Sequence, residues 1–281
     1  MSLTYDIKYQ LKYGSVITKL IVINILVFLF GGLINLFVFM NNLQFNFANE
    51  FLSMPSNLSK LAYKPWTLLA YQFSHSDLFH LISNMLILYF SGRIFTDFFL
   101  KKDTWLIYLL GGFTGAILYL ITFNFFTVFQ NSNSTLIGAS GSILAILFAA
   151  TAYAPNLRVS IWGIFELKLL WLSFGFLLLD LITIPASNAG GHIAHIGGAL
   201  LGWFYARHKQ NNLNWFSFNF FKEKSMKNYK VEINKNVKTK TNKNNPSQDE
   251  VDAILDKISK NGYDRLSKEE KDILFKASQD K

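Results

Sequence analysis

The sequence predicts an all-α fold, a polytopic membrane protein with a bundle of six transmembrane helices and a small helical hairpin at its carboxy-terminal end. Two observations lead to this class. The 281 residues are 51% hydrophobic and only 16% charged, which is too apolar for an ordinary soluble domain. Six apolar stretches also recur along the chain, and most of them reach the roughly 20 residues that a membrane-spanning helix needs.

The six apolar stretches define a membrane domain over residues 15–208, which follows a short amino-terminal segment at residues 1–14. The first stretch is longer than the apolar region of a signal peptide and no small-residue cleavage site follows it, so we expect a retained anchor. The fourth stretch is short and covers only about 24 Å of a hydrocarbon layer about 30 Å thick, so its first residues should lie below the lipid surface. The stretches lie near residues 15–40, 78–98, 104–123, 139–154, 167–186 and 191–208.

Lysines and arginines collect at alternating ends of the apolar stretches, and residues 205–244 alone carry one arginine and nine lysines against two glutamates. Because basic loops stay on the cytoplasmic side, both termini are predicted to be cytoplasmic, and we expect an integral protein of a bacterial inner (plasma) membrane. The second, fourth and sixth helices then run in the same direction, so residues at their starts lie at a similar depth. The expected partner is the lipid bilayer and not a nucleic acid, because no nucleic-acid recognition motif accompanies the charge.

The tail divides into a basic linker at residues 209–246 and a small cytoplasmic helical hairpin at residues 247–281. An aromatic cluster in the linker is suited to the membrane interface. Two Ser-x-x-Glu patterns predict the helix starts of the hairpin, and Asn261-Gly262 predicts the end of its first helix. The aromatic cluster consists of Trp215, Phe216, Phe218, Phe220 and Phe221, and the two patterns begin at Ser247 and Ser267.

Ser140 is the candidate nucleophile. It lies in Gly138-Ala139-Ser140-Gly141, at the start of the fourth apolar stretch. The glycines allow a tight backbone path there, and the unpaired N–H groups of the first helical turn can stabilise an oxyanion that forms beside the hydroxyl. The alternative interpretation is a helix-capping serine within a packing motif.

His195 is the candidate general base, because a neutral imidazole can take the hydroxyl proton and later give it to the leaving amine. It lies near the start of the sixth stretch, beside Gly198 and Gly202. A matching pair of small residues, Gly141 and Ala145, lies on the fourth stretch. Small residues four apart let helix backbones approach closely, so contact between these two faces would bring the histidine to the serine.

Three further polar residues lie in apolar stretches. His80 and Asn84 share one face of the second helix, and the Asn84 amide is a donor that suits an oxyanion hole. The alternative role of His80 is a hydrogen bond between helices. Asp180, in the fifth stretch, can orient a histidine as the third member of a triad, but a structural hydrogen bond is the favoured interpretation.

No metal site and no cofactor are expected. The chain has no cysteine, and the pair His192-x-x-His195 resembles half of a metal site without a nearby carboxylate and without an HExxH motif. A metal-dependent membrane protein that uses several histidines stays open as an alternative. The histidines concerned are His75, His80, His192 and His195.

Together, these residues resemble the rhomboid family of intramembrane serine proteases, over roughly residues 15–208. Gly138-Ala139-Ser140-Gly141 is similar to the family motif G-x-S-G, and Ala194-His195-Ile196-Gly197-Gly198 is similar to A-H-x-x-G. The run from His75 to Asn84 resembles the motif of the second helix. The resemblance implies a six-helix core with a water-filled outer cavity and a Ser140–His195 dyad without an acid. It also implies an oxyanion site at His80, Asn84 and the Ser140 N–H.

The implied activity is endopeptidase cleavage of transmembrane segments, so the implied partners are transmembrane protein substrates. Two positions depart from the family pattern. Leu144 stands where many members carry an aromatic residue that stacks on the histidine, and the acidic residue that often follows the second-helix pattern is missing near Ser91–Asp97. Neither departure removes Ser140 or His195. A catalytically inactive rhomboid-like protein that binds membrane proteins stays as the alternative function, although the presence of both Ser140 and His195 argues against it.

Overall fold

The computed structural model describes residues 14–130, 132–161, 163, 165–186, 188–211 and 248–279. The chain splits into two compact units, Met1–Phe221 and Lys222–Lys281. Several predicted features lie outside the described residues: the amino-terminal segment up to residue 13, most of the linker with its aromatic cluster, and the helix start at Ser247.

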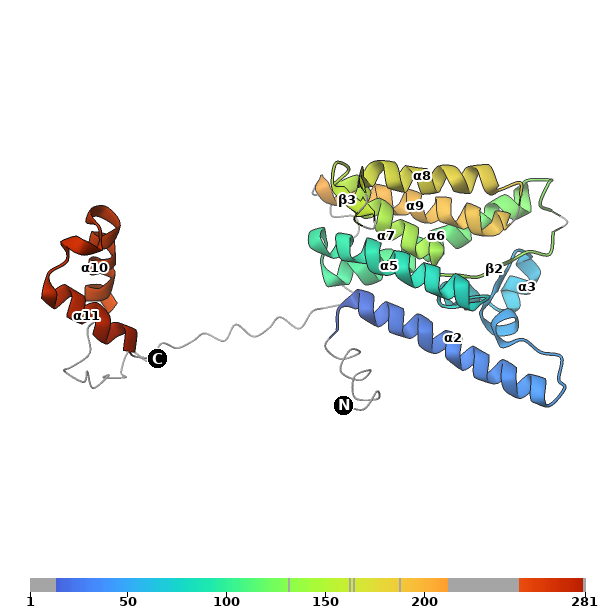
Figure 1. Cartoon of the computed structure of the whole chain (residues 1–281). Helices are drawn as coiled ribbons and strands as arrows, with labels where there is room; N and C mark the ends of the chain where they lie inside the picture. The colour runs from blue at the N-terminus through green and yellow to red at the C-terminus, as the bar shows by residue number, and fades with distance from the viewer. Residues whose placement is uncertain are drawn as a thin grey trace, which may run out of the picture. The chain divides into compact units, whose positions relative to one another are not determined.

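Long helices that run side by side make up most of the first unit (Figure 1). Between the first two of them lie short helical turns: η1 Ala48–Leu52, α3 Leu58–Tyr63, α4 Thr67–Ala70 and η2 Tyr71–Phe73. The long helices are α2 Val16–Met40, α5 Leu78–Phe98, α6 Lys101–Phe125, α7 Ser140–Tyr153, α8 Leu169–Thr183 and α9 Ala189–Gln210. This confirms a mostly helical protein with apolar helices near the predicted places.

Within the described residues, two small antiparallel strand pairs that were not predicted from the sequence connect the helices. β1 Met54–Pro55 pairs with β2 Thr135–Leu136, and β3 Arg158–Ile161 pairs with β4 Phe165–Lys168. Strands of two to four residues are too short to leave a readable alternation of polar and apolar residues. The β1–β2 pair matters for the site, because β2 leads directly into α7.

Three of the described helices are long and apolar enough to cross a membrane, namely α2, α5 and α6. α7 and α8 are apolar but shorter, with 14 and 15 residues. Length and composition alone therefore support three of the six predicted spans.

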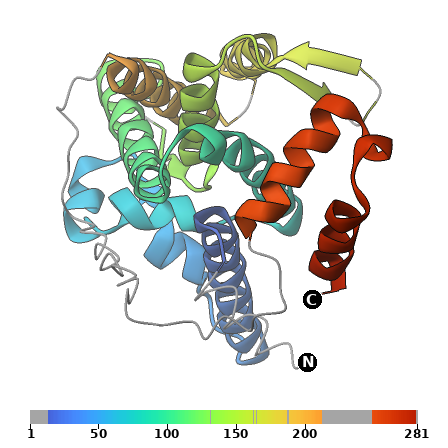
Figure 2. The ribbon, with the colours of Figure 1, turned by 90° about the vertical axis from the view of Figure 1, so that its left-hand side faces the viewer.

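α7 lies at the centre of the bundle, between α2 at one edge and α8 at the other (Figures 1 and 2). Its residues from Gly141 to Ala152 are all buried. A methyl group added to Gly198 of α9 would overlap the carbonyl oxygen of Gly141, and one added to Gly202 would overlap that of Ala145. The predicted contact between the two small-residue faces is thus confirmed, with the backbones of α7 and α9 touching.

α6 completes this tightly packed core. A methyl group on Gly111 would overlap the Ala145 side chain of α7, and one on Gly115 would come 2.7 Å from the carbonyl oxygen of Ala194 in α9. At the opposite end of the same helices, Lys209 of α9 forms an ion pair with the buried carboxylate of Asp103 of α6, with both N···O distances at 2.9 Å. These contacts hold α6, α7 and α9 in one register.

The second unit contains α10 Gln248–Asn261, the turn η4 Tyr263–Arg265 and α11 Lys268–Gln279. Ser267 and Glu270 form the predicted capping box: the Glu270 N–H donates to the Ser267 hydroxyl, and the Ser267 N–H donates to the Glu270 carboxylate. The hydrogen bond from the Lys257 ammonium group, and then the bond from the Ser267 N–H, lower the pKa of Glu270. Gly262, with φ of +79°, follows the end of α10 as predicted.

We predict that Gly198→Ala lowers the free energy of unfolding of the first unit by about 1–3 kcal/mol, because its new methyl group must push apart two backbones that now touch. The measurement is unfolding of the purified protein in detergent, followed by circular dichroism. Gly175→Ala in α8 is the matched control, since a methyl group there meets nothing within 4 Å. Equal stability of the two variants would contradict the packing described here.

Candidate active site

Ser140 and His195 lie together at one end of the bundle. Ser140 is the first residue of α7, and His195 lies in the second turn of α9. The Oγ atom of Ser140 is 2.5 Å from Nε2 of His195, which is hydrogen-bond distance. Gly198 and Gly202, which follow His195 on α9, hold α9 against the backbone of α7. The side chains of Ser140 and His195 therefore meet directly from their two helices.

Asp180 of α8 lies on the other side of the histidine. Its Oδ1 atom is 2.8 Å from Nδ1 of His195 and 2.7 Å from Nδ1 of His192. The carboxylate is largely buried, as Asp180 is 8% exposed. The expectation that no carboxylate lies near His192 and His195 was therefore wrong. Asp180 lies 12 and 15 residues before them on the preceding helix, and it becomes their neighbour when α8 packs on α9.

Asp180, His192 and His195 are also a group whose ligand atoms all lie within 4.8 Å of one another, so the three residues could hold a metal ion. The same distances are those of ordinary hydrogen bonds between imidazole N–H groups and a carboxylate. The rings of the four histidines of the metal-dependent alternative pack in two pairs, His75 with His80 and His192 with His195.

His80 packs against the backbone that enters α7. Gly138 has φ of +123°, and a methyl group on it would lie 2.9 Å from the His80 ring. The N–H of Gly138 donates to the carbonyl of Tyr71 at 3.0 Å, which ties this backbone to η2. On its other side, Nδ1 of His80 is 3.0 Å from the hydroxyl of Ser76. His80 therefore fixes the approach to Ser140.

Asn84 lies one turn after His80 and is 5% exposed. Its Nδ2 donates to the His80 carbonyl at 2.9 Å, which accounts for one of the two amide hydrogens and leaves the second for another acceptor. His75 precedes the helix and is 4% exposed. Burial, and then the neighbouring His80, lower the pKa of His75 to about 3, so its ring is neutral at physiological pH. A neutral buried ring suits a packing role.

The start of α7 offers hydrogen-bond donors beside Ser140. Ala139, the residue before the helix, makes no side-chain capping hydrogen bond. The N–H groups of a first helical turn have no partners within the helix and carry partial positive charge. An anion that forms beside Ser140 can therefore be stabilised by these groups.

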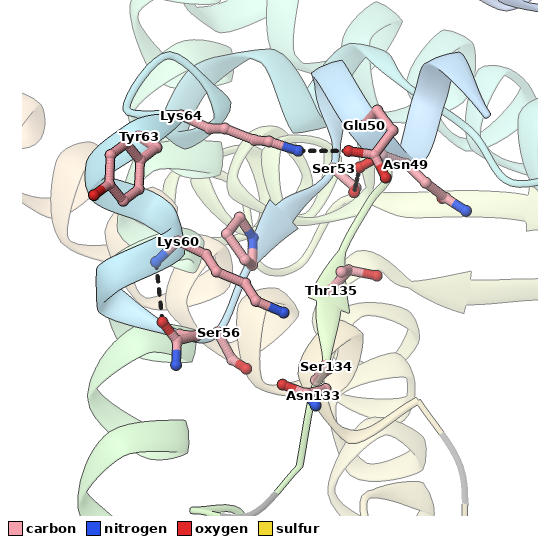
Figure 3. Close-up of a pocket in the computed structure, with 12 residues that line it drawn as sticks. Asn49, Glu50, Ser53, Ser56, Lys60, Tyr63, Lys64, Asn133, Ser134 and Thr135 are labelled. Atoms are coloured by element: carbon pink, nitrogen blue, oxygen red, sulfur yellow. Dashed lines mark hydrogen bonds and ion pairs between the residues drawn. The ribbon is translucent and has the colours of Figure 1, made fainter. Parts of the chain in front are cut away.

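A separate pocket of about 460 Å³ lies beside the β1–β2 pair (Figure 3). Its lining includes Ser53, Lys60 and Thr135, and Lys64 forms an ion pair with Glu50 at 2.9 Å on its rim. None of the candidate site residues lines it. The pocket therefore borders the strand that leads to Ser140 without including the reactive side chains.

Comparison with known proteins gives two family matches. A family model described as Rhomboid domain matches residues 62–209, and a family of unknown function, DUF6576, matches residues 235–280. The chain is similar to RHOMBOID-like protein 12, mitochondrial, of Arabidopsis thaliana, with 30% identity over 56% of this chain and 49% of the relative. It is also similar to Presenilin-associated rhomboid-like protein A, mitochondrial, of Danio rerio, with 32% identity over 47% of this chain and 34% of the relative.

A third relative is Rhomboid-related protein 1 of Caenorhabditis elegans, with 30% identity over 52% of this chain and 40% of the relative. The chain spans less than half the length of these three relatives.

The comparisons contradict the predicted location in a bacterial inner membrane with cytoplasmic termini. Relatives from Arabidopsis thaliana, Danio rerio and Bos taurus are named as mitochondrial proteins, and this finding overturns the bacterial assignment. The reason for the error is physical. A bias of basic residues reports on the two sides of a membrane relative to each other, and it carries no information on which membrane is crossed.

We predict that Gly138→Ala reduces the labelling of Ser140 by a serine-directed fluorophosphonate, because the methyl group meets both an unfavourable φ and the His80 ring. Gly163→Ala is the matched control. Gly163 also has a positive φ, of +73°, but a methyl group there has nothing within 4 Å. If both variants label like the wild type, the contact between His80 and Gly138 does not position Ser140.

Proposed function

The chain belongs to the rhomboid family, and we propose that it is an intramembrane serine endopeptidase. The observation that carries the proposal is the 2.5 Å distance between Ser140 Oγ and His195 Nε2. A serine hydroxyl becomes an effective nucleophile when a base within hydrogen-bond reach takes its proton. The proposed substrates are transmembrane segments of other membrane proteins, and the proposed reaction uses no cofactor.

In the proposed mechanism, the Ser140 oxygen attacks the carbonyl carbon of the scissile peptide bond while His195 Nε2 accepts the hydroxyl proton. The tetrahedral oxyanion is stabilised by the Ser140 backbone N–H, by Asn84 and by His80. His195 then gives its proton to the leaving amine, and an acyl-enzyme remains. Water attacks this ester with His195 again as base, which releases the carboxylic acid and restores Ser140.

We further propose that α7, α8 and α9 also cross the membrane, which makes six spans. A 14-residue helix is about 21 Å long, shorter than a hydrocarbon layer of about 30 Å, so Ser140 would begin below the lipid surface. The non-helical backbone before it is held by protein: Leu136 pairs with Met54 in the strand ladder, and Gly138 bonds to Tyr71. Such backbone is tolerated at membrane depth when it is buried in protein or lines a water-filled cavity, and hydrolysis needs that water.

The substrate must also expose a peptide bond. In an intact transmembrane helix, each carbonyl is hydrogen-bonded and shielded by side chains, so Ser140 cannot approach it. Segments with glycine or proline near one end unwind more easily and should be preferred.

The central test is cleavage of a reporter transmembrane substrate by the protein in liposomes. We expect the wild type to cleave, and Ser140→Ala and His195→Ala each to lose at least about 10³-fold in rate, because nucleophile and base act as one unit. Ser142→Ala is the matched control. This hydroxyl lies two residues away and donates to Gln72 at 2.8 Å, so its loss should cost about 1 kcal/mol of stability and leave cleavage intact.

Three results would contradict the proposal: equal cleavage by the wild type and both variants, loss of cleavage on addition of a chelator, or no cleavage of any reporter by a folded wild type. The second would favour a metal held by Asp180, His192 and His195. The third would favour the inactive, substrate-binding alternative.

For the oxyanion site, we predict that Asn84→Ala lowers kcat by about 10²–10³-fold with little change in KM, since the amide would act mainly on the transition state. Ser91→Ala on the same helix is the control. The buried Ser91 hydroxyl donates to the carbonyl of Ile87 within α5, so its removal affects a hydrogen bond inside the helix. An unchanged kcat in Asn84→Ala would assign that residue a structural role.

A further inference from the structure

We propose that Asp180 is a positioning residue that extends the Ser140–His195 pair to a Ser-His-Asp triad, with one residue on each of three helices. This inference rests on the function proposed above. It starts from the two short distances at His195: Nε2 lies 2.5 Å from Ser140 Oγ, and Nδ1 lies 2.8 Å from Asp180 Oδ1. One imidazole ring thus bridges the end of α8 and the start of α7.

The carboxylate selects the tautomer of the ring. A neutral imidazole carries its proton on one of the two nitrogens, and an ionised carboxylate can only accept a hydrogen bond. At 2.8 Å from Oδ1, Nδ1 must therefore carry the proton, since two lone pairs would otherwise face each other. The lone pair of Nε2 is then directed at the Ser140 hydroxyl, which is the arrangement that a general base requires.

The carboxylate also stabilises the charge that catalysis creates. When Nε2 takes the serine proton, His195 becomes an imidazolium cation in a largely buried site. Opposite charges attract more strongly where water is scarce, so the Asp180 carboxylate lowers the energy of the cation relative to the neutral ring. The Nδ1 proton stays on the imidazole throughout and is not transferred to Asp180.

His192 holds the carboxylate in place. It lies three residues before His195 on the same face of α9, and its Nδ1 is 2.7 Å from the same Oδ1 atom of Asp180. One carboxylate oxygen thus accepts hydrogen bonds from both rings, and the two bonds together limit the rotation of the Asp180 side chain. His192 thereby has a role in holding the Asp180 carboxylate, which a mechanism with Ser140 and His195 alone does not assign to it.

The test must distinguish the positioning role of Asp180 from a merely structural role, in which the carboxylate only links α8 to α9. The chain offers a matched control on α8. Ser173 is fully buried, and its hydroxyl lies 2.6 Å from that of Thr151 in α7. Ser173→Ala thus removes a buried polar link between α8 and its neighbour without touching the histidines.

The kinetic test uses the full-length protein in liposomes with the reporter substrate. We expect Asp180→Asn to lower kcat by about 10²–10⁴-fold with KM nearly unchanged, because an amide can donate to Nδ1 and favour the wrong tautomer. Asp180→Glu should recover part of the lost rate, whereas Ser173→Ala should keep the wild-type kcat. A wild-type kcat in Asp180→Asn, or equal losses in Asp180→Asn and Ser173→Ala, would overturn the inference.

A spectroscopic test on the wild-type protein needs no turnover. The ¹⁵N spectrum of wild-type protein labelled at histidine, with His195 assigned by comparison with His195→Ala, should show a protonated Nδ1 and an unprotonated Nε2. The opposite tautomer, or a mixture of both, would overturn the inference. Failure of the proposed function is distinguishable, because it appears as equal rates for wild type and Ser140→Ala.

Discussion

The close approach of α7 and α9 is the constraint on which the rest of the structure depends. Gly198 and Gly202 have no side chains to hold the two helices apart, so their backbones lie against the carbonyl oxygens of Gly141 and Ala145. This contact sets the distance between the start of α7 and the second turn of α9, where Ser140 and His195 meet. A wider spacing would break the hydrogen bond between the Ser140 hydroxyl and Nε2 of His195 and leave these two atoms unpaired in an apolar bundle, which is costly.

The helices could be predicted closely from the sequence because a helix that crosses lipid needs about 20 consecutive, mostly apolar residues. The expected stretches at 78–98 and 139–154 differ by at most one residue at each end from α5 Leu78–Phe98 and α7 Ser140–Tyr153. The contact between the small-residue faces was also readable, since it needs only spacing on two helices. The strand pairs were not, because β1 and β2 are two residues long and depend on contacts distant in sequence.

The candidate site likewise contains residues whose contacts could be predicted from the sequence and one whose contacts could not. Ser140 and His195 stand in local motifs, so their proximity could be predicted before any coordinates were known. Asp180 stands alone in an apolar stretch, and nothing in its surroundings indicates which histidine it meets. The available signal was the free-energy cost of burying the Asp180 carboxylate, because a carboxylate within an apolar helix is retained where it finds a partner. The packing of α8 on α9 provides that partner, at 2.8 Å from His195 and 2.7 Å from His192.

These polar groups also satisfy one another. The hydroxyl of Ser140, the ring of His195 and the carboxylate of Asp180 form a continuous chain of hydrogen bonds, and His192 adds a second donor to the carboxylate. A buried polar group without a partner destabilises the fold, whereas a fully paired network fixes one arrangement of its members. The same bonds that make burial tolerable therefore also orient the imidazole toward the serine. Stability and reactivity are coupled at this site, so a substitution at Asp180 has to be judged by kcat and by histidine tautomer as well as by unfolding.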